Sequence, residues 1–378
     1  MSKQKLNIND ERKPEEAIKS LLETAENPLW ENGNLGDFLK NVQFRRGKVD
    51  LTFEIPVPVK NTILTDKIEQ LVYKALENVE GITKTESKFI SKVNSINEIE
   101  VGNKILSNIK NIIGVASNKG GVGKSTVTAN LAAALKVLGA KVAVLDLDIY
   151  GPNVPNFFGV TSRPRYFDKL IAPVEKYGIP LMSVGFLIEN ESSPIILRAP
   201  LVNRIVMEFL QEVRWEDADY MVVDLPPGTG DIQLTLAQQL PNTKMLFVTT
   251  PQDVALADVY KGVRMFQQEG IKLAILGVVE NMSYFICDGC NKRHDIFDSG
   301  GAKELASTFD FELYGEVPLF TELRISGDRG KPIVLENPDH PVSKIFLEIA
   351  KKVSIDIAQV NHEAIGRNDR VVIPLDLS

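Results

Sequence analysis

The stretch "IIGVASNKGGVGKSTVTANLAAAL", residues 112–135, joins an apolar run, a glycine-rich loop and a helix of small residues, and this order decides the fold. Gly120, Gly121 and Gly123 let the backbone curl so that several N–H groups point at one anion. A helix beginning near Ser125 adds its positive end to the same point. The strand–loop–helix order therefore predicts a phosphate-binding P-loop.

The loop fits the variant pattern K-G-G-x-G-K-[ST] and departs from the strict P-loop pattern, because Asn118 stands where the first glycine would be. We expect Lys124 on the β- and γ-phosphates of a nucleotide and Ser125 on Mg²⁺, with Lys119 as an additional lysine before the glycines. A glycine-rich helix start without a ligand is the alternative. The flanking strand and helix favour the nucleotide site.

Two later stretches end apolar runs with carboxylates that suit the same site. "VLDLDIYGPN" contains Asp146 and Asp148, and "YMVVDLPPGTGD" contains Asp224 before a stiff turn that includes Gly228. In an open parallel sheet such carboxylates project into the crevice at the carboxyl ends of the strands. One of them can orient the attacking water or hold hydrated magnesium. Each acid alone fits a solvated strand end, but the three in this order predict a nucleotide-hydrolysing site.

The apolar runs beyond residue 111 lack alternation and are separated by helical patterns. This predicts an α/β fold of the P-loop NTPase type, with a mostly parallel sheet and helices on both faces. A small α/β domain precedes it, because alternating strand patterns and two amphipathic helices occur there. The expected layout is a disordered N-terminus at 1–13, the small domain at 14–90, a linker at 91–110, the ATPase domain at 111–355 and a C-terminal tail at 356–378.

The composition disfavours nucleic-acid-binding, membrane-spanning and secreted proteins. The 378 residues include 43 Lys and Arg against 50 Asp and Glu, a formal charge of −7, which disfavours a general nucleic-acid surface. No run approaches the roughly 18 apolar residues of a membrane span, and the first residues lack the apolar core of a secretory signal. Two cysteines in the chain fit a reducing compartment. We expect a cytoplasmic protein whose partners include neither nucleic acid nor membrane.

The two cysteines, Cys287 and Cys290, lie close together in "YFICDGCNKRH", residues 284–294. A C-x-x-C pair supplies two soft ligands, whereas a closed zinc or iron–sulfur site usually needs four. The pair is therefore either a redox couple or half of a site that is completed elsewhere.

Five features together resemble the Mrp/ApbC family of P-loop iron–sulfur carrier ATPases: "KGGVGKST", "DLDIYGPN", "DLPPGTGD", "VVENMSYF" and the C-x-x-C pair. That family belongs with the deviant Walker A ATPases, alongside nitrogenase iron protein and the MinD and ParA positioning proteins. The resemblance covers about residues 111–355. Residues 14–90 resemble a domain related to iron–sulfur assembly factors, although "EIPVPVKNT" lacks the cysteine often found in its central loop.

The resemblance implies roles at the matching positions. Lys119 resembles the signature lysine that reaches the nucleotide of the partner protomer. Asp148 matches the acid that positions water, and Asp146 is the acid just before it. Asp224 matches the Walker B-like acid, and Asn281 the asparagine that reads the adenine ring. The implied catalytic residues are Lys119, Lys124, Asp148 and Asp224, and the implied nucleotide-binding residues are Gly120, Gly121, Val122, Gly123, Lys124, Ser125, Thr126, Asp146, Gly228 and Asn281.

Three uses of the cysteine pair can be compared. A redox C-x-x-C sits at a helix N-terminus, whereas this pair follows a strand and lies in a turn-like segment. Structural zinc needs two further ligands, of which His294 offers one. In a twofold dimer the pair occurs twice, and four thiolates are what a [4Fe–4S] cluster requires. We expect Cys287 and Cys290 to bridge a cluster across a homodimer, with zinc and a redox dithiol as less favoured alternatives.

The resemblance thus implies an ATP- and Mg²⁺-dependent carrier that receives a labile [4Fe–4S] cluster from scaffold proteins and delivers it to apo-proteins. Hydrolysis is expected to release γ-phosphate contacts of the 224–231 loop and so alter the cysteine site. The alternative is a ParA- or MinD-like positioning ATPase whose cysteines hold zinc or act in redox chemistry. That alternative predicts a basic patch or a basic amphipathic C-terminal helix, and the ending "NHEAIGRNDRVVIPLDLS" is neither.

Overall fold

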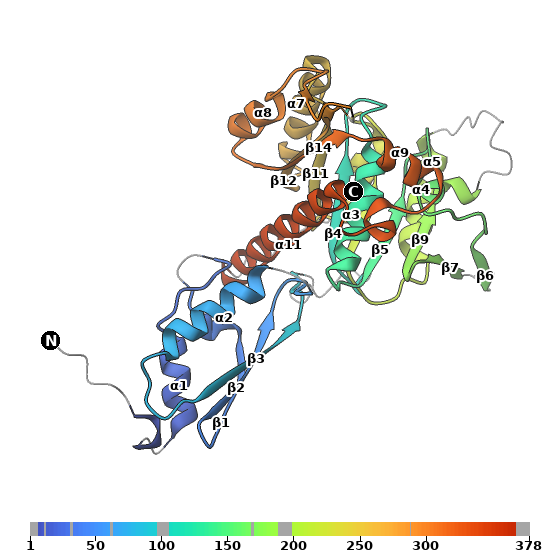
Figure 1. Ribbon diagram of the computed structural model, residues 1–378. Coiled ribbons are helices and arrows are strands. Elements are labelled where there is room, and N and C mark those ends of the chain that lie inside the picture. Colours follow the sequence, from blue (N-terminus) through green and yellow to red (C-terminus); the bar gives the residue numbers. More distant parts are fainter. Residues whose placement is uncertain are drawn as a thin grey trace. The chain divides into compact units, whose positions relative to one another are not determined.

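The computed structural model describes residues 7–10, 13–30, 33–60, 63–96, 106–167, 170–187, 199–287 and 289–367. They divide into two compact units (Figure 1). The first unit consists of the described residues of Met1–Asn94 together with Ala358–Glu363, and the second of those of Ser95–Ile357 and Ala364–Ser378. Each unit is described by itself.

The first unit is a three-stranded sheet with two helices. Strands β1 (Leu39–Arg45) and β2 (Lys48–Ile55) form an antiparallel hairpin, and β3 (Lys84–Ser91) pairs parallel with β2. The alternation expected in β2 is observed, because every second residue from Val49 to Ile55 is buried. The other elements of this unit are the short helices η1 (Ile8–Asp10) and η2 (Leu35–Phe38) and the longer helices α1 (Pro14–Leu22) and α2 (Ile63–Leu76).

The start of the chain differs from the predicted disorder over 1–13. Asn7 forms a β-bridge with Glu80, and the Ile8 amide donates to the Glu80 carbonyl oxygen at 2.9 Å. The Ile8 side chain is fully buried. Burial of this isoleucine holds the described part of the segment in the first unit, which its polar neighbours obscured in the sequence.

The chain's last described helix, α11 (Pro341–Arg367), runs past residue 355, where the sequence predicts a tail. In the first unit His362 stacks on Trp30 with ring centroids 4.3 Å apart, and the Asn361 amide donates to the Asn94 carbonyl oxygen at 3.2 Å. Asn361 is polar yet fully buried, so it interrupts the apolar period that marks a helix in the sequence. The remainder of the predicted tail, and part of the predicted linker at 91–110, lie outside the described residues, and the other boundaries stay predictions.

In the second unit the described residues form a nine-stranded sheet in the order β13-β12-β11-β4-β10-β5-β9-β8, with β14 also paired to β12. All pairs are parallel except β12–β13 and β8–β9, which confirms the predicted mostly parallel α/β class. The strands are β4 (Ile109–Ala116), β5 (Val142–Asp146), β8 (Val174–Lys176), β9 (Ile179–Ser183), β10 (Ala218–Asp224), β11 (Lys244–Thr249), β12 (Ala274–Ile286), β13 (Arg293–His294) and β14 (Glu312–Leu319).

Helices cover both faces of this sheet. Met221 and Val223 of β10 join a buried cluster with side chains from α5, α6, α7 and α8, whereas α3 contacts β4, β5, β10 and β11 without joining that cluster. The strands are buried on both faces, which explains their continuous apolar runs. The helical elements are α3 (Lys124–Val137), α4 (Val154–Phe157), η3 (Val184–Leu187), α5 (Ala199–Gln211), α6 (Asp231–Gln239), α7 (Asp253–Gln267), α8 (Gly301–Phe309), α9 (Thr321–Asp328) and α10 (Ile333–Glu336).

A separate two-stranded hairpin, β6 (Arg165–Phe167) and β7 (Leu170–Ala172), lies between α4 and β8 in the chain. No helix among the described residues combines the length and the apolarity that crossing a membrane requires.

Candidate functional site

The P-loop joins the end of β4 to the start of α3 and borders a cavity of about 340 Å³. Gly121 and Gly123 have φ angles of +82° and +81°, a backbone region that glycine adopts without steric cost. The cavity lining includes every residue from Lys119 to Thr126, together with Asp148, Tyr150 and Pro227. The structure therefore brings the glycine-rich loop and one of the expected acids to the same cavity.

The ends of three neighbouring strands form a buried polar row beside the loop. Asp224 of β10 lies in register with Asp146 of β5, and Asp146 with Ser183 of β9. Both carboxylates are fully buried, and Ser183 Oγ donates to Asp146 Oδ2 at 2.8 Å. Burial, followed by the negative charge of Asp224, raises the pKa of Asp146 well above its ordinary value.

Lys124 lies between the acids in an ion-paired cluster. Its Nζ is 2.8 Å from Asp224 Oδ2 and 3.1 Å from Asp148 Oδ2, contacts that lack hydrogen-bond geometry. Burial alone would lower the pKa of Lys124, but the charges of Asp224 and Asp148 outweigh it and raise that pKa. Ser125 Oγ and Thr128 Oγ1 each donate to a different oxygen of Asp224 at 2.6 Å. Phosphate oxygens that bind Lys124 must therefore compete with carboxylates.

These residues fit a bound magnesium ion. Two carboxylates, Asp148 and Asp224, pair with a single ammonium group, so the cluster carries an excess of negative charge, and its hydroxyl and carboxylate oxygens are the donors that Mg²⁺ prefers. No group of three or more His, Cys, Asp or Glu within the described ranges is arranged to hold a metal ion without other ligands. Mg²⁺ does not require such a group, because it usually keeps several waters and takes further ligands from phosphates.

Lys119 contacts its own chain at the start of α7. Its Nζ donates to Gln252 Oε1 at 3.1 Å, and Ser117 Oγ donates to the Lys119 carbonyl oxygen at 3.1 Å. The neighbouring Asn118 packs on the same helix, because a Cβ built at Gly262 would lie 2.5 Å from Asn118 Oδ1. The asparagine that departs from the strict loop pattern is thus accommodated by a glycine on α7.

The 224–231 loop is held by a buried amide that the sequence analysis missed. Gln233 Nε2 donates to the carbonyl oxygens of Pro226 at 2.7 Å and Gly228 at 3.1 Å, and its Oε1 accepts from the Gly230 amide. Gly228 in turn donates its amide to the Ser117 carbonyl oxygen at 3.0 Å. A Gln three residues after the helix-capping glycine is the local signal that predicts such a contact.

Three further residues were missed for different reasons. Thr128 lies four residues after Lys124, one helical turn away, so its contact with Asp224 follows from helix geometry. Ser183 and Gln252 come from distant strand and helix ends, and no local pattern in the sequence marks their contacts with Asp146 and Lys119.

Asn281 lies on β12 and contacts the P-loop backbone. Its Nδ2 donates to the Val122 carbonyl oxygen at 2.9 Å, and its side chain is 3% exposed. Asn281 is not among the residues that line the described cavity. The adenine-reading role that the resemblance implies stays a prediction, and the contact in the structure is with the loop.

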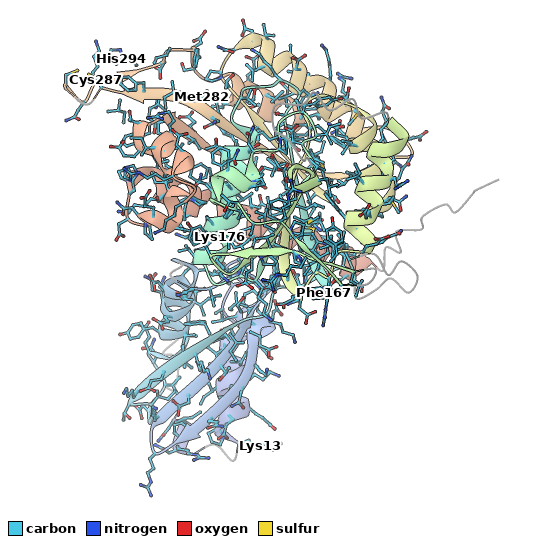
Figure 2. All side chains as sticks on the ribbon, turned by 90° about the vertical axis from the view of Figure 1, so that its right-hand side faces the viewer. Lys13, Phe167, Lys176, Met282, Cys287 and His294 are labelled. Carbon is cyan, nitrogen blue, oxygen red and sulfur yellow. The ribbon has the colours of Figure 1, made fainter. Side chains whose placement is uncertain are left out.

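Cys287 and Cys290 lie in the turn of a hairpin formed by β12 and β13. The Cys287 amide donates to the Lys292 carbonyl oxygen at 3.0 Å, and the Asn291 amide to the Cys287 carbonyl oxygen at 2.8 Å. Figure 2 shows the labelled Cys287 and His294 at the outer end of this hairpin. Cys287 is half-buried and Cys290 exposed, and neither takes part in a disulfide within the described structure. Both sulfur atoms thus belong to a surface hairpin.

The hairpin is supported by charged and aromatic contacts. The Arg293 guanidinium lies 4.1 Å from the centre of the Tyr284 ring, and its Nε is 2.8 Å from Asp295 Oδ1. His294 pairs with Phe285 across the two strands. Among the described residues His294 joins no group of three metal-ligating side chains.

The sequence of this chain is similar to those of known iron–sulfur proteins. The family model described as "ParA: NUBPL iron-transfer P-loop NTPase" matches residues 108–354. The iron–sulfur cluster carrier protein of Aquifex aeolicus is 39% identical over 361 residues, which cover 89% of this chain and 98% of that protein. The iron–sulfur cluster transfer protein NUBPL of Dictyostelium discoideum is 42% identical over 261 residues, covering 68% and 80%.

A solved structure agrees with these relatives. A nucleotide-binding protein from Archaeoglobus fulgidus, solved with ADP, superposes with a TM-score of 0.56 at 37% identity and covers 67% of this chain and 97% of its own. The match of the family model and the two relatives confirm the resemblance carried by the motifs. The chain belongs to the Mrp/NUBPL family of iron–sulfur cluster carrier P-loop NTPases.

Proposed function

We propose that this protein is an ATP-dependent carrier of iron–sulfur clusters. Two copies of the chain bind a [4Fe–4S] cluster as cargo between their Cys287 and Cys290 pairs and deliver it to apo-proteins. The observation that carries the proposal is the pairing, in one unit, of a P-loop cavity with an exposed C-x-x-C hairpin. The names of the relatives support the same activity.

At the nucleotide, the chain's own groups bind and orient the phosphates. Backbone N–H groups from Gly120 to Thr126 and the N-terminus of α3 surround the β- and γ-phosphates. Lys124 moves from Asp148 and Asp224 to the phosphate oxygens, which frees Asp148 to accept a hydrogen bond from the attacking water. Mg²⁺, held by Ser125 with the carboxylate of Asp224 nearby, supplies charge neutralisation when bound.

Lys119 acts on the nucleotide of the partner protomer. In the single chain its ammonium is hydrogen-bonded to Gln252, so its transfer to a phosphate replaces a neutral acceptor by a charged one. Charge-assisted hydrogen bonds are about twice as strong as neutral ones, which favours the exchange in the assembled dimer. The lysine thereby stabilises transition-state charge in trans, as an arginine finger does.

At the cysteines, each chain offers two of the four thiolates that a [4Fe–4S] cluster takes. Because both residues lie in a surface turn, a bridging cluster sits between protomers and remains accessible to a recipient. A resident structural metal would instead be enclosed by four ligands from one chain.

Anaerobic reconstitution with iron and sulfide tests the proposal. Wild type is expected to show the visible charge-transfer absorption that is typical of iron–sulfur proteins. Mass measurement and analysis of bound iron and sulfide should give about four of each per dimer. Cys287→Ala/Cys290→Ala should lose both, whereas the control His294→Ala should keep them, since His294 is not a ligand in this scheme. A featureless wild-type spectrum with stoichiometric zinc would overturn the carrier and favour structural zinc.

A further inference from the structure

Strand β12 connects the two sites. It runs from Ala274 to Ile286 between β11 and β14, and its next residue is Cys287. Asn281, in the middle of the strand, contacts the P-loop, and the end of the strand pairs with β13 to form the cysteine hairpin. A single element of secondary structure therefore touches the nucleotide loop and positions the cysteines.

The contact between β12 and the loop is close. Asn281 Nδ2 donates to the Val122 carbonyl oxygen at 2.9 Å inside the protein. A Cβ built at Gly123 would collide with Asn281 Nδ2 and would lie 3.6 Å from Met282 Cε. Only glycine fits at position 123, so the strand packs directly on the loop backbone.

The carbonyl that Asn281 holds is one end of a peptide whose other end, the Gly123 N–H, would meet the phosphates in the proposed nucleotide site. The Val122 C=O and the Gly123 N–H belong to one planar peptide unit and point in opposite directions. When the Gly123 N–H turns toward a phosphate oxygen, the Val122 carbonyl must turn as well. The Asn281 amide therefore senses the orientation of a nucleotide-binding peptide.

The strand is kinked directly after this contact. Met282 has a φ angle of +55°, unusual for a residue with a side chain, and the register of β12 with β14 shifts between Asn281 and Phe285. Such bulges redirect the residues that follow them. Figure 2 labels Met282 on this strand and Cys287 just past the end of the strand.

The residues on either side of Met282 make further hydrogen bonds that hold the kink. Ser283 Oγ donates to Glu280 Oε1 at 2.6 Å, and Glu280 Oε2 accepts from the Ala302 amide at 3.1 Å. Glu280 is buried, so we expect the segment held by these two hydrogen bonds to be more rigid than the exposed hairpin that follows it. Residues on both sides of Met282 are thus held by hydrogen bonds inside the protein.

We propose that Asn281 is a positioning residue that couples the nucleotide state of the P-loop to the exposure of Cys287 and Cys290 through the kink at Met282. The inference rests on the proposed carrier function and adds a route for its switching. It differs from a route through the 224–231 loop, whose contacts run to Ser117 and Gln233.

Thiol alkylation tests the coupling, because Cys287 and Cys290 are the chain's only cysteines and report on the hairpin alone. The full-length apo-protein is alkylated with iodoacetamide, with and without a saturating non-hydrolysable ATP analogue and Mg²⁺, after occupancy has been measured. In wild type the analogue should change the alkylation rate about fivefold, at the low end of coupling between sites. In Asn281→Ala at saturation this change should disappear.

The matched control is Asn130→Ala. Asn130 is also a buried asparagine, but it lies on α3, where its Nδ2 donates to the Thr126 carbonyl oxygen at 2.9 Å within the helix. This variant should keep the wild-type response. Loss of the response in both asparagine variants would overturn the assignment to β12, and so would a full response in Asn281→Ala.

A second variant keeps the coupling testable if Asn281→Ala fails to bind the nucleotide. Met282→Gly keeps the contact with Val122 but lets the strand bend freely at the kink, because glycine tolerates many backbone conformations. It should reduce the response to less than half. A wild-type response in Met282→Gly, or no response in wild type, overturns the coupling whatever Asn281→Ala does.

Cluster reconstitution separates the two proposals. If wild type assembles a cluster but its alkylation rate is the same with and without the nucleotide, the coupling proposal is wrong and the carrier proposal is supported. If alkylation follows the nucleotide but no cluster assembles, the carrier fails and the coupling stands as a property of the fold.

Discussion

The P-loop cluster and the cysteine hairpin place charged and reactive side chains in opposite surroundings. Lys124 is 5% exposed and Asp224 is fully buried, and their contacts with each other and with Ser125 lie inside the protein. In the hairpin, Cys290 is exposed and Arg293 and Asp295 pair at the surface. Phosphoryl transfer gains from preorganised charges away from water, whereas a cargo site must admit a second protein. Substitutions should therefore lower activity or stability strongly in the P-loop cluster and only slightly in the cysteine hairpin.

The largest expected effect is on hydrolysis. Lys124→Ala removes the ammonium that neutralises phosphate charge, so we expect ATP turnover to fall by about 100-fold or more, as for loss of one transition-state contact. Phosphate release measures this, with Lys141→Ala, a lysine outside the site, as the control. If the variant also transfers clusters to an apo-protein as fast as wild type, ATP has no role in transfer.

A pair of matched substitutions tests the comparison through stability. Asp224→Asn breaks a buried ion pair and should lower the free energy of unfolding by about 3 kcal/mol, at the low end because repulsion with Asp146 is relieved. Asp295→Asn breaks the exposed pair with Arg293 and should cost about 0–1 kcal/mol. Urea unfolding monitored by circular dichroism measures both. Equal losses would contradict the difference between the regions.

A smaller effect is expected in the pH dependence of stability. The folded protein holds the Asp146 proton more tightly than the unfolded chain, because burial and Asp224 raise the pKa of that carboxyl. Its contribution is complete below the unfolded pKa of about 4 and is lost as pH rises through the raised pKa. Relative to wild type, Asp146→Asn should therefore gain stability as the pH rises above about 4 in magnesium-free buffer. A constant difference between the two unfolding free energies would show that Asp146 titrates normally.

The smallest effect concerns the cysteines of the apo-protein. Cys287→Ser/Cys290→Ser changes only groups in a surface turn, so the free energy of unfolding should stay within about 0.5 kcal/mol of wild type. The same urea titration measures it. A loss comparable with that of Asp224→Asn would mean that the thiols serve the fold itself, and the contrast between the two regions would break down.

The parts of this site that could be predicted are those with local patterns. The P-loop and the acids at the ends of β5 and β10 are marked by a strand, a turn and a helix in fixed order, so the parallel class and the convergence of Asp146, Asp148 and Asp224 followed from the sequence. Lys124 in contact with carboxylates was not expected, because a motif describes the bound ligand rather than the internal ion pairs that compete with it.

The parts that could not be predicted depend on contacts between distant segments. Gln252 is 133 residues from Lys119, and Asn281 is 159 residues from Val122. The end of α11 was misjudged because its continuation is stabilised by Trp30 and Asn94 rather than by a helix pattern of its own. Such contacts arise from the order of the strands in the folded sheet. They produce no recognisable pattern of residue spacing in the sequence.

The composition of the first unit has a consequence for the order in which the protein folds during synthesis. Its sheet is translated before the second unit, but Ala358–Glu363, which belong to the same unit as the sheet, emerge only after Ser95–Ile357 of the second unit. Until then the Trp30 ring lacks the His362 ring on which it stacks. The first unit therefore stays incomplete until most of the second has been translated, and a nascent chain arrested before residue 358 should expose this surface to chaperones.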